Sequence, residues 1–156
     1  HYLERYASSS GNLARVLERK ILRRARERGE DPAAFLPLVA ETVAKVLELK
    51  LIDDAAFAEA KVASLRRRGA SKAQLNAKLA AKGVDRETAS AAMAADETDE
   101  AEAARAYARR RRLGPHRTRD RPEKRDRDVA AMMRQGFSFA LAAATIDGEA
   151  EDPLAG

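Results

Sequence analysis

Residues 71–84 read SKAQLNAKLAAKGV, and this stretch sets a pattern that recurs along the chain. Ser71 can cap the N-terminus of a short helix. Leu75 and Leu79 lie four residues apart, so they share one face of that helix. Gly83 can then adopt the left-handed conformation that commonly ends a helix. The stretch therefore predicts a capped helix with one buried face and a glycine stop.

The same pattern returns towards the C-terminus. Met132 lies four residues before Gly136, as Leu79 lies four residues before Gly83. A looser copy precedes Gly29, and the copies recur with a period of about 45–60 residues, which is typical of helical repeat proteins. We therefore expect a tandem array of three-helix repeats. A single irregular bundle, in which glycines merely end helices, remains the alternative.

Capping residues and glycines divide the chain into eight predicted helices. They span about residues 12–28, 32–47, 54–68, 72–82, 86–95, 97–112, 122–135 and 139–146. The expected organisation is a first repeat at residues 1–52, a second at 53–96, a third with a basic loop at 97–147, and an acidic tail at 148–156. We expect the stretch 114–122 to be a solvated loop. Because the chain starts at His1 rather than methionine, we also expect the first repeat to lack its native N-terminus.

The composition favours an all-α fold. The 156 residues are rich in alanine and arginine, 35% are charged and 4% are aromatic. Such a mixture forms helices readily and is poor in the residues that favour strands. The sequence has no run of about 18 apolar residues, which is the length needed to span a membrane. The absence of cysteine excludes disulfides and thiolate metal sites. We expect a cytoplasmic protein.

No constellation typical of an enzyme is present. His1 and His116 are the two histidines, and the eight glycines are scattered rather than gathered in a phosphate-binding loop. The pair Asp53–Asp54 is better explained as a helix cap than as a metal site. We therefore expect no catalytic residues, no metal ligands and no cofactor.

Charge is distributed unevenly along the chain. The formal net charge is +5, but residues 1–28 carry +5 and residues 109–127 carry +7, while residues 85–102 carry −6. Separate zones of this kind can bind a polyanion with one surface and a basic protein with another. Charges that serve only to solvate a helical protein are an equally good explanation at this point.

Several further motifs carry a resemblance to a known family. They are KLIDDAAFA at residues 50–58, LRRRG at 65–69, YARRRRLGP at 107–115 and RQGFSF at 134–139. Together with residues 71–84 they resemble the bacterial RecX family, over nearly the whole chain from Tyr2 to Ile146. The resemblance implies an elongated, curved array of three-helix repeats. It also implies a regulator, in most cases an inhibitor, of the recombinase RecA.

Family members of this kind lie in the groove of the RecA–single-stranded DNA filament. They suppress strand exchange, ATP hydrolysis and coprotease activity in DNA repair and the SOS response, and they bind single- and double-stranded DNA. The partners implied are therefore the RecA nucleoprotein filament and DNA, with no membrane and a monomeric chain. A general nucleic-acid-binding helical protein without a RecA target is the alternative, and a helical scaffold charged for solubility is a third.

Basic residues in the second and third repeats are the candidate contacts to DNA or RecA. Two arginine runs, 66–68 and 109–112, each end a predicted helix before a glycine, so they occupy corresponding positions in the two repeats. Arginine binds phosphate through two parallel hydrogen bonds. The alternative is that both runs are solvated helix ends favoured by the helix dipole. The candidates are Arg66, Arg67, Arg68, Lys72, Arg105, Arg109, Arg110, Arg111, Arg112, Arg117, Arg119 and Arg121.

Overall fold

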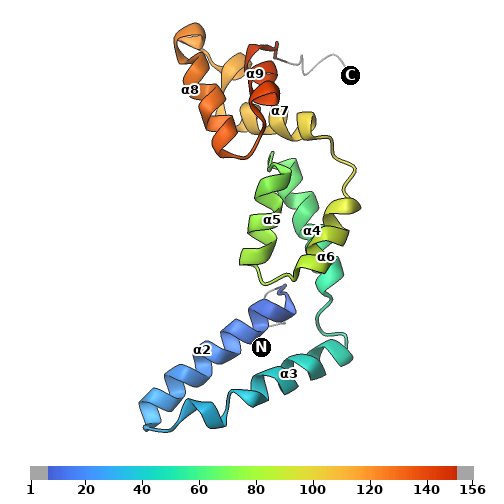
Figure 1. Cartoon of the computed structure of the whole chain (residues 1–156), viewed down its shortest axis with the longest axis vertical. Coiled ribbons are helices and arrows are strands. Elements are labelled where there is room, and N and C mark those ends of the chain that lie inside the picture. The colour runs from blue at the N-terminus through green and yellow to red at the C-terminus, as the bar shows by residue number, and fades with distance from the viewer. Residues whose placement is uncertain (1–6, 151–156) are drawn as a thin grey trace. The chain divides into compact units, whose positions relative to one another are not determined.

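The computed structural model describes residues 7–150, and the regular secondary structure within this range is entirely helical (Figure 1). The elements are α2 (Ser10–Arg28), η1 (Pro32–Ala34), α3 (Pro37–Glu48), α4 (Asp54–Arg67), α5 (Lys72–Ala81), α6 (Arg86–Ala94), α7 (Glu100–Arg111), η2 (Gly114–His116), α8 (Arg121–Arg134) and α9 (Phe139–Asp147). The absence of strands from this range confirms the all-α prediction. The expected acidic tail lies outside the described residues from Glu151 onward, as does the start of the first repeat up to Tyr6.

The chain forms two compact units. Unit 1 extends to Ala60 and includes Lys78–Ala92, whereas unit 2 consists of Lys61–Ala77 and the residues from Met93 onward. The boundary falls within α4, α5 and α6, so each of these helices contributes residues to both units.

In unit 1, α2 and α3 pack against one another with few buried side chains. Ser9 caps α2 by accepting a hydrogen bond from the Asn12 N–H, and Gly29 ends the helix in the left-handed conformation. The buried side chains of these two helices are small in number: Leu13 and Ala25 from α2, and Val39 from α3. The pair therefore has a thin core.

The prediction of a single helix at residues 32–47 is wrong. The structure has a 3-10 turn at Pro32–Ala34, capped by Asp31, and α3 begins at Pro37. The reason is that Pro37 has no N–H to continue a helical hydrogen-bond ladder from the preceding turn. Phe35 and Leu36, which precede Pro37, are exposed, as is Leu47 near the end of α3.

In unit 2, α7, α8 and α9 enclose the main core. Alanines on α7 are fully buried and let neighbouring helices approach closely, and the rings of Tyr107 and Phe137 lie 6.0 Å apart. The buried residues of this core are Ala103, Ala104, Tyr107, Ala108, Leu113, Val129, Met132, Phe137, Ala142 and Ile146. On α7, Ala103, Ala104 and Ala108 are fully buried, whereas Ala101 is only partly buried. Phe139, the first residue of α9, is exposed.

The stretch expected to be a solvated loop is partly buried. Leu113 and Gly114 belong to the interior of unit 2, and Gly114 begins the short helix η2. The Gly114 N–H donates a hydrogen bond of 2.9 Å to the buried carboxylate of Asp128. The start of this charged segment can therefore be buried, because Asp128 of α8 accepts the hydrogen bond of its backbone N–H.

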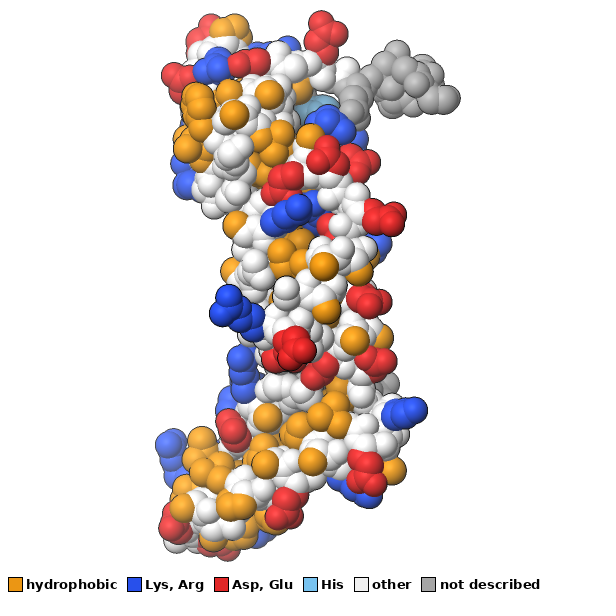
Figure 2. Space-filling view, turned by 45° about the vertical axis from the view of Figure 1, so that its right-hand side comes forward, with side chains coloured by type: hydrophobic (Ala, Val, Ile, Leu, Met, Phe, Trp, Pro, Cys, Tyr) orange, Lys and Arg blue, Asp and Glu red, His pale blue; other side chains and the backbone are white. Residues whose placement is uncertain are grey.

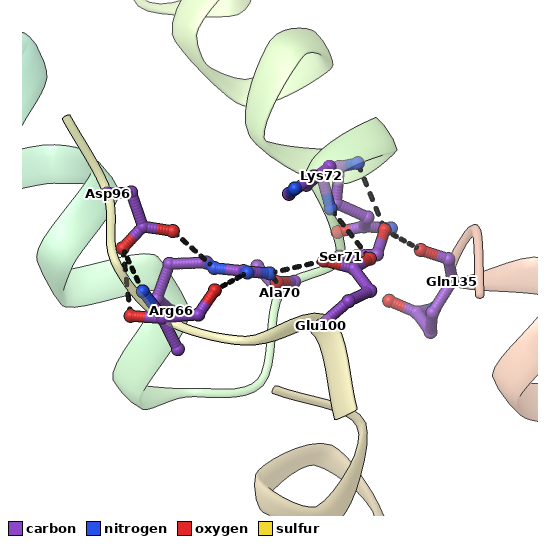
Figure 3. Close-up of polar contacts among 9 residues, drawn as sticks. Arg66, Ala70, Ser71, Lys72, Asp96, Glu100 and Gln135 are labelled. Atoms are coloured by element: carbon purple, nitrogen blue, oxygen red, sulfur yellow. Dashed lines mark hydrogen bonds and ion pairs between the residues drawn. The ribbon is translucent and has the colours of Figure 1, made fainter. Parts of the chain in front are cut away.

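The same contact between a serine and a glycine-bearing turn occurs once in each unit. In unit 1, the Ser9 hydroxyl donates to the Lys82 carbonyl, next to Gly83. In unit 2, Ser71 caps α5 by accepting from the Gln74 N–H and donates to the Gln135 carbonyl, next to Gly136 (Figure 3). Each serine thus satisfies its own helix and the end of another helix.

Gly136 is the position where this contact is most sensitive to substitution. Its φ is +92°, and a Cβ there would lie 2.8 Å from both the Ala73 Cβ and the Ser71 Oγ. We expect Gly136→Ala to destabilise the protein by about 2–4 kcal/mol, because left-handed strain adds to overpacking. Urea unfolding followed by circular dichroism measures this. Gly29→Ala is the control, since that glycine has a similar φ of +66° but open space around it, and a loss as large there would contradict the packing argument.

Candidate nucleic-acid interface

All twelve predicted contact residues belong to unit 2, but the structure gives them different environments. Arg66 differs most from the expectation, because its side chain is 1% exposed. Its guanidinium donates to the Asp96 and Glu100 carboxylates, each at 2.7 Å, and also to two backbone carbonyls (Figure 3). Arg66 therefore holds α4 against the segment before α7, and its guanidinium is shielded from solvent.

Glu100 extends this network to the next helix. One of its carboxylate oxygens accepts from Arg66, and the other accepts from the Lys72 backbone N–H at 3.0 Å, at the start of α5. The carboxylate thus balances the charge of a buried guanidinium and accepts a hydrogen bond from an N–H that has no partner within its own helix. No sequence signal marked this network, because Asp96 and Glu100 lie at least 30 residues away from Arg66 along the chain.

Exposed arginines of α4 and α7 lie around one hollow. Arg67 from the end of α4 and Arg105 and Arg109 from α7 line a depression of about 540 Å³, together with Glu102 and Thr98, and the buried Arg66 also lies along its wall. Because Arg105 and Arg109 are four residues apart, they share one face of α7. The structure therefore brings one exposed arginine from each run, Arg67 and Arg109, to one place together with Arg105.

The same two α7 arginines also line a second hollow of about 530 Å³ on the side of η2 and α9. His116 and Thr145 add polar groups to it, and Leu141 adds an apolar wall. His116 was not among the predicted contacts, which were all arginine or lysine residues. The arginine-rich surface therefore continues from the α4 side of α7 to its α9 side.

The end of α7 adds further exposed cations. Arg110 lies over the Tyr107 ring, with its guanidinium carbon 5.8 Å from the ring centre, and Arg111 is exposed. Arg112 ends the helix in the left-handed conformation, at a φ of +54°. Arg68, Lys72 and Arg119 are also exposed.

Arg117 and Arg121 serve the fold of unit 2. Arg121 donates hydrogen bonds to the carbonyls of Ile146, Asp147 and Gly148 at the end of α9. Arg117 donates twice to Asp128, at 2.6 Å each, and this pairing raises the pKa of Arg117. Burial would raise the pKa of the Asp128 carboxyl, but the hydrogen bonds from Arg117 and the Gly114 N–H outweigh burial and lower it.

The lowered pKa of Asp128 predicts a loss of stability in acid. Because the carboxyl is more acidic in the folded than in the unfolded chain, its contribution is complete above the unfolded pKa of about 3.9 and is lost as the pH falls through the folded value. We expect the free energy of unfolding to fall as the pH is lowered from about 5 to about 2. Its dependence on pH should be shallower in Asp128→Asn than in the parent protein. Urea unfolding across this range measures both slopes, and equal slopes would contradict the prediction.

Among residues 7–150, no cluster of His, Cys, Asp or Glu could hold a metal ion. In the same range, no helix combines the length and the apolar character needed to cross a membrane. Fold and surface together define an all-α protein with an arginine-rich face, which suits an anionic partner.

Comparison with known proteins identifies the family. Residues 53–93 match the family model described as "RecX, second three-helix domain". The chain is 42% identical over 151 residues to the Regulatory protein RecX of Myxococcus xanthus (strain DK1622), which covers 94% of this chain and 81% of that protein. It is 44% identical over 140 residues to the Regulatory protein RecX of Agrobacterium fabrum (strain C58), covering 86% of this chain and 75% of that one. No solved structure matches significantly.

The chain therefore belongs to the RecX family, as the sequence motifs indicated. Family membership makes it a regulatory, non-enzymatic protein.

Proposed function

We propose that the protein regulates RecA by binding the RecA filament assembled on single-stranded DNA, and that it inhibits strand exchange, ATP hydrolysis and coprotease activity. Its relatives in this family are regulatory proteins, and the resemblance of the motifs implies RecA as the target. Such a function places the protein in the cytoplasm, where the monomer meets the filament.

The observation that carries the interface is the gathering of Arg67, Arg105 and Arg109 around one hollow. Phosphate oxygens or carboxylates can accept two hydrogen bonds from each guanidinium. Arg66 also lines the hollow, but its guanidinium is buried and already paired with Asp96 and Glu100, so it is not assigned to the interface. We therefore assign the contact with DNA or with acidic RecA surface to the exposed arginines of α4 and α7.

We also propose that the chain is a tandem array of three-helix repeats at residues 1–52, 53–96 and 97–147. The repeated serine contact supports this arrangement, since Ser9 meets the Gly83 turn as Ser71 meets the Gly136 turn. An array in which each repeat meets the next through the same contact would generate both pairs.

A RecA ATPase titration on single-stranded DNA tests the function. We expect the parent protein to inhibit at well below one molecule per RecA. The double variant Arg67→Glu/Arg109→Glu should require more protein for the same inhibition, because charge reversal repels phosphate. Each lost phosphate contact should also reduce the salt slope of filament binding by about one unit.

The matched control is Arg23→Glu/Arg26→Glu, which makes the same charge change on exposed positions of α2. We expect it to inhibit like the parent. An equal loss of ATPase inhibition in both double variants would mean that net charge alone decides binding. Binding to free DNA without any effect on the ATPase would favour the general nucleic-acid-binding protein.

A further inference from the structure

Unit 1 carries an apolar surface that the proposed function does not use. Nine large apolar side chains are exposed among the described residues, and seven of them lie between Leu22 and Leu51. Figure 2 shows apolar side chains gathered over the α2–α3 part of the molecule, with basic and acidic side chains at their edge. Exposed apolar groups concentrated in one segment typically mark a binding surface.

Part of this surface forms a hollow of about 320 Å³ between α2, η1 and α3. Its apolar wall is made by Leu17 and Ile21 of α2, with Phe35 and Leu38 from the other side. Leu38 is half exposed and Phe35 is more than one third exposed, so both side chains keep area that a partner could bury. A hollow of this size accepts one or two apolar side chains of a partner.

The cations along the hollow indicate the charge of that partner. Lys20, Arg24 and Arg28 of α2 all line it, and they follow one another at intervals of four residues. This spacing places them in one row, about 6 Å apart along the helix axis. Glu30, beyond the end of α2, is the one acidic residue among the lining residues.

We propose that this hollow binds an amphipathic helix of a partner protein, with its apolar side chains in the hollow and a row of carboxylates against Lys20, Arg24 and Arg28. The apolar wall favours a peptide over nucleic acid, since a phosphate backbone offers nothing to bury there. The site lies wholly in unit 1, whereas the arginine-rich surface lies in unit 2. The protein therefore has a second docking surface for a different kind of ligand.

A synthetic peptide tests this proposal directly. The probe is an amphipathic helix of about 16 residues, roughly four turns, with leucines on one face and glutamates flanking them, labelled with fluorescein. Fluorescence anisotropy with the full chain should detect saturable binding. A peptide with lysines in place of the glutamates should not bind, because it would face the same row of cations.

Variants at the hollow are compared with matched variants on the same helix. We expect Arg24→Glu and Leu38→Ser each to weaken probe binding by about tenfold, as charge and apolar contacts are lost. Arg23→Glu and Leu22→Ser change exposed α2 residues outside the hollow and should stay within about twofold of the parent. Glu30→Gln should tighten binding, because it removes the one repulsive charge.

Backbone amide NMR of the full chain with the unlabelled probe locates the site. Shifts confined to α2, η1 and the start of α3 would support the proposal. Shifts elsewhere, equal losses in the matched controls, or displacement of the probe by an oligonucleotide of thymidines would overturn it. A hollow already filled by the chain's own residues or by a second copy would prevent saturable binding and would also overturn it.

Discussion

Replacing Arg66 with methionine is expected to destabilise the protein by about 3–5 kcal/mol, which is the usual consequence of removing one partner from a buried ion pair. The substitution keeps an unbranched apolar side chain of similar length to the methylene stem of arginine but removes the guanidinium. The Asp96 carboxylate, which is 8% exposed, would then be left buried without its cation. The carbonyls of Ala70 and Thr98 would also lose their donor. Urea unfolding followed by circular dichroism measures the loss.

Arg67→Met is the matched control, because the neighbouring arginine is exposed and lines the arginine-rich hollow. We expect its stability to remain within about 0.5 kcal/mol of the parent. A second variant, Arg66→Met/Asp96→Asn, should recover part of the stability, because it removes the uncompensated charge. Equal stability of Arg66→Met and Arg67→Met would contradict the structural role assigned to Arg66.

Shortening Leu79 to alanine is expected to cost about 2–5 kcal/mol through the cavity that it leaves. The side chain is fully buried on α5, at 0% exposure, one turn before the Gly83 stop. Helices around such a position relax only in part, so the loss exceeds the transfer free energy of the deleted methyl groups. The temperature midpoint and the urea midpoint should both fall.

Leu51→Ala is the matched control, since Leu51 is 61% exposed. We expect that variant to unfold within about 0.5 kcal/mol of the parent. A Leu79→Ala protein that unfolds like the parent but fails to regulate RecA would make Leu79 a contact residue instead of a core residue.

Local patterns predicted many of the helix ends correctly. Ser71 and Ser138 cap α5 and α9 through their side-chain oxygens, and Asp85 accepts from the Thr88 N–H at the start of α6. Gly83 and Gly136 adopt positive φ at the stops where they were expected. These features depend on hydrogen bonds between near neighbours, so they are visible in a few consecutive residues.

Other boundaries depended on contacts that the local pattern does not contain. The sequence predicted a helix from residue 97, but α7 begins at Glu100. Before it, the Asp96 side chain accepts from the Thr98 hydroxyl, and the Thr98 carbonyl accepts from Arg66. A distant guanidinium thus holds this segment outside the helix.

The sequence by itself determined the helical class, the RecX resemblance and the richness of arginine at two helix ends. It could not separate Arg66 from Arg67, which are adjacent arginines at the end of one helix. Tertiary structure decided that difference, because neighbouring residues on a helix point in directions about 100° apart. One direction meets the carboxylates of Asp96 and Glu100 and is buried, whereas the other meets solvent beside Arg105 and Arg109.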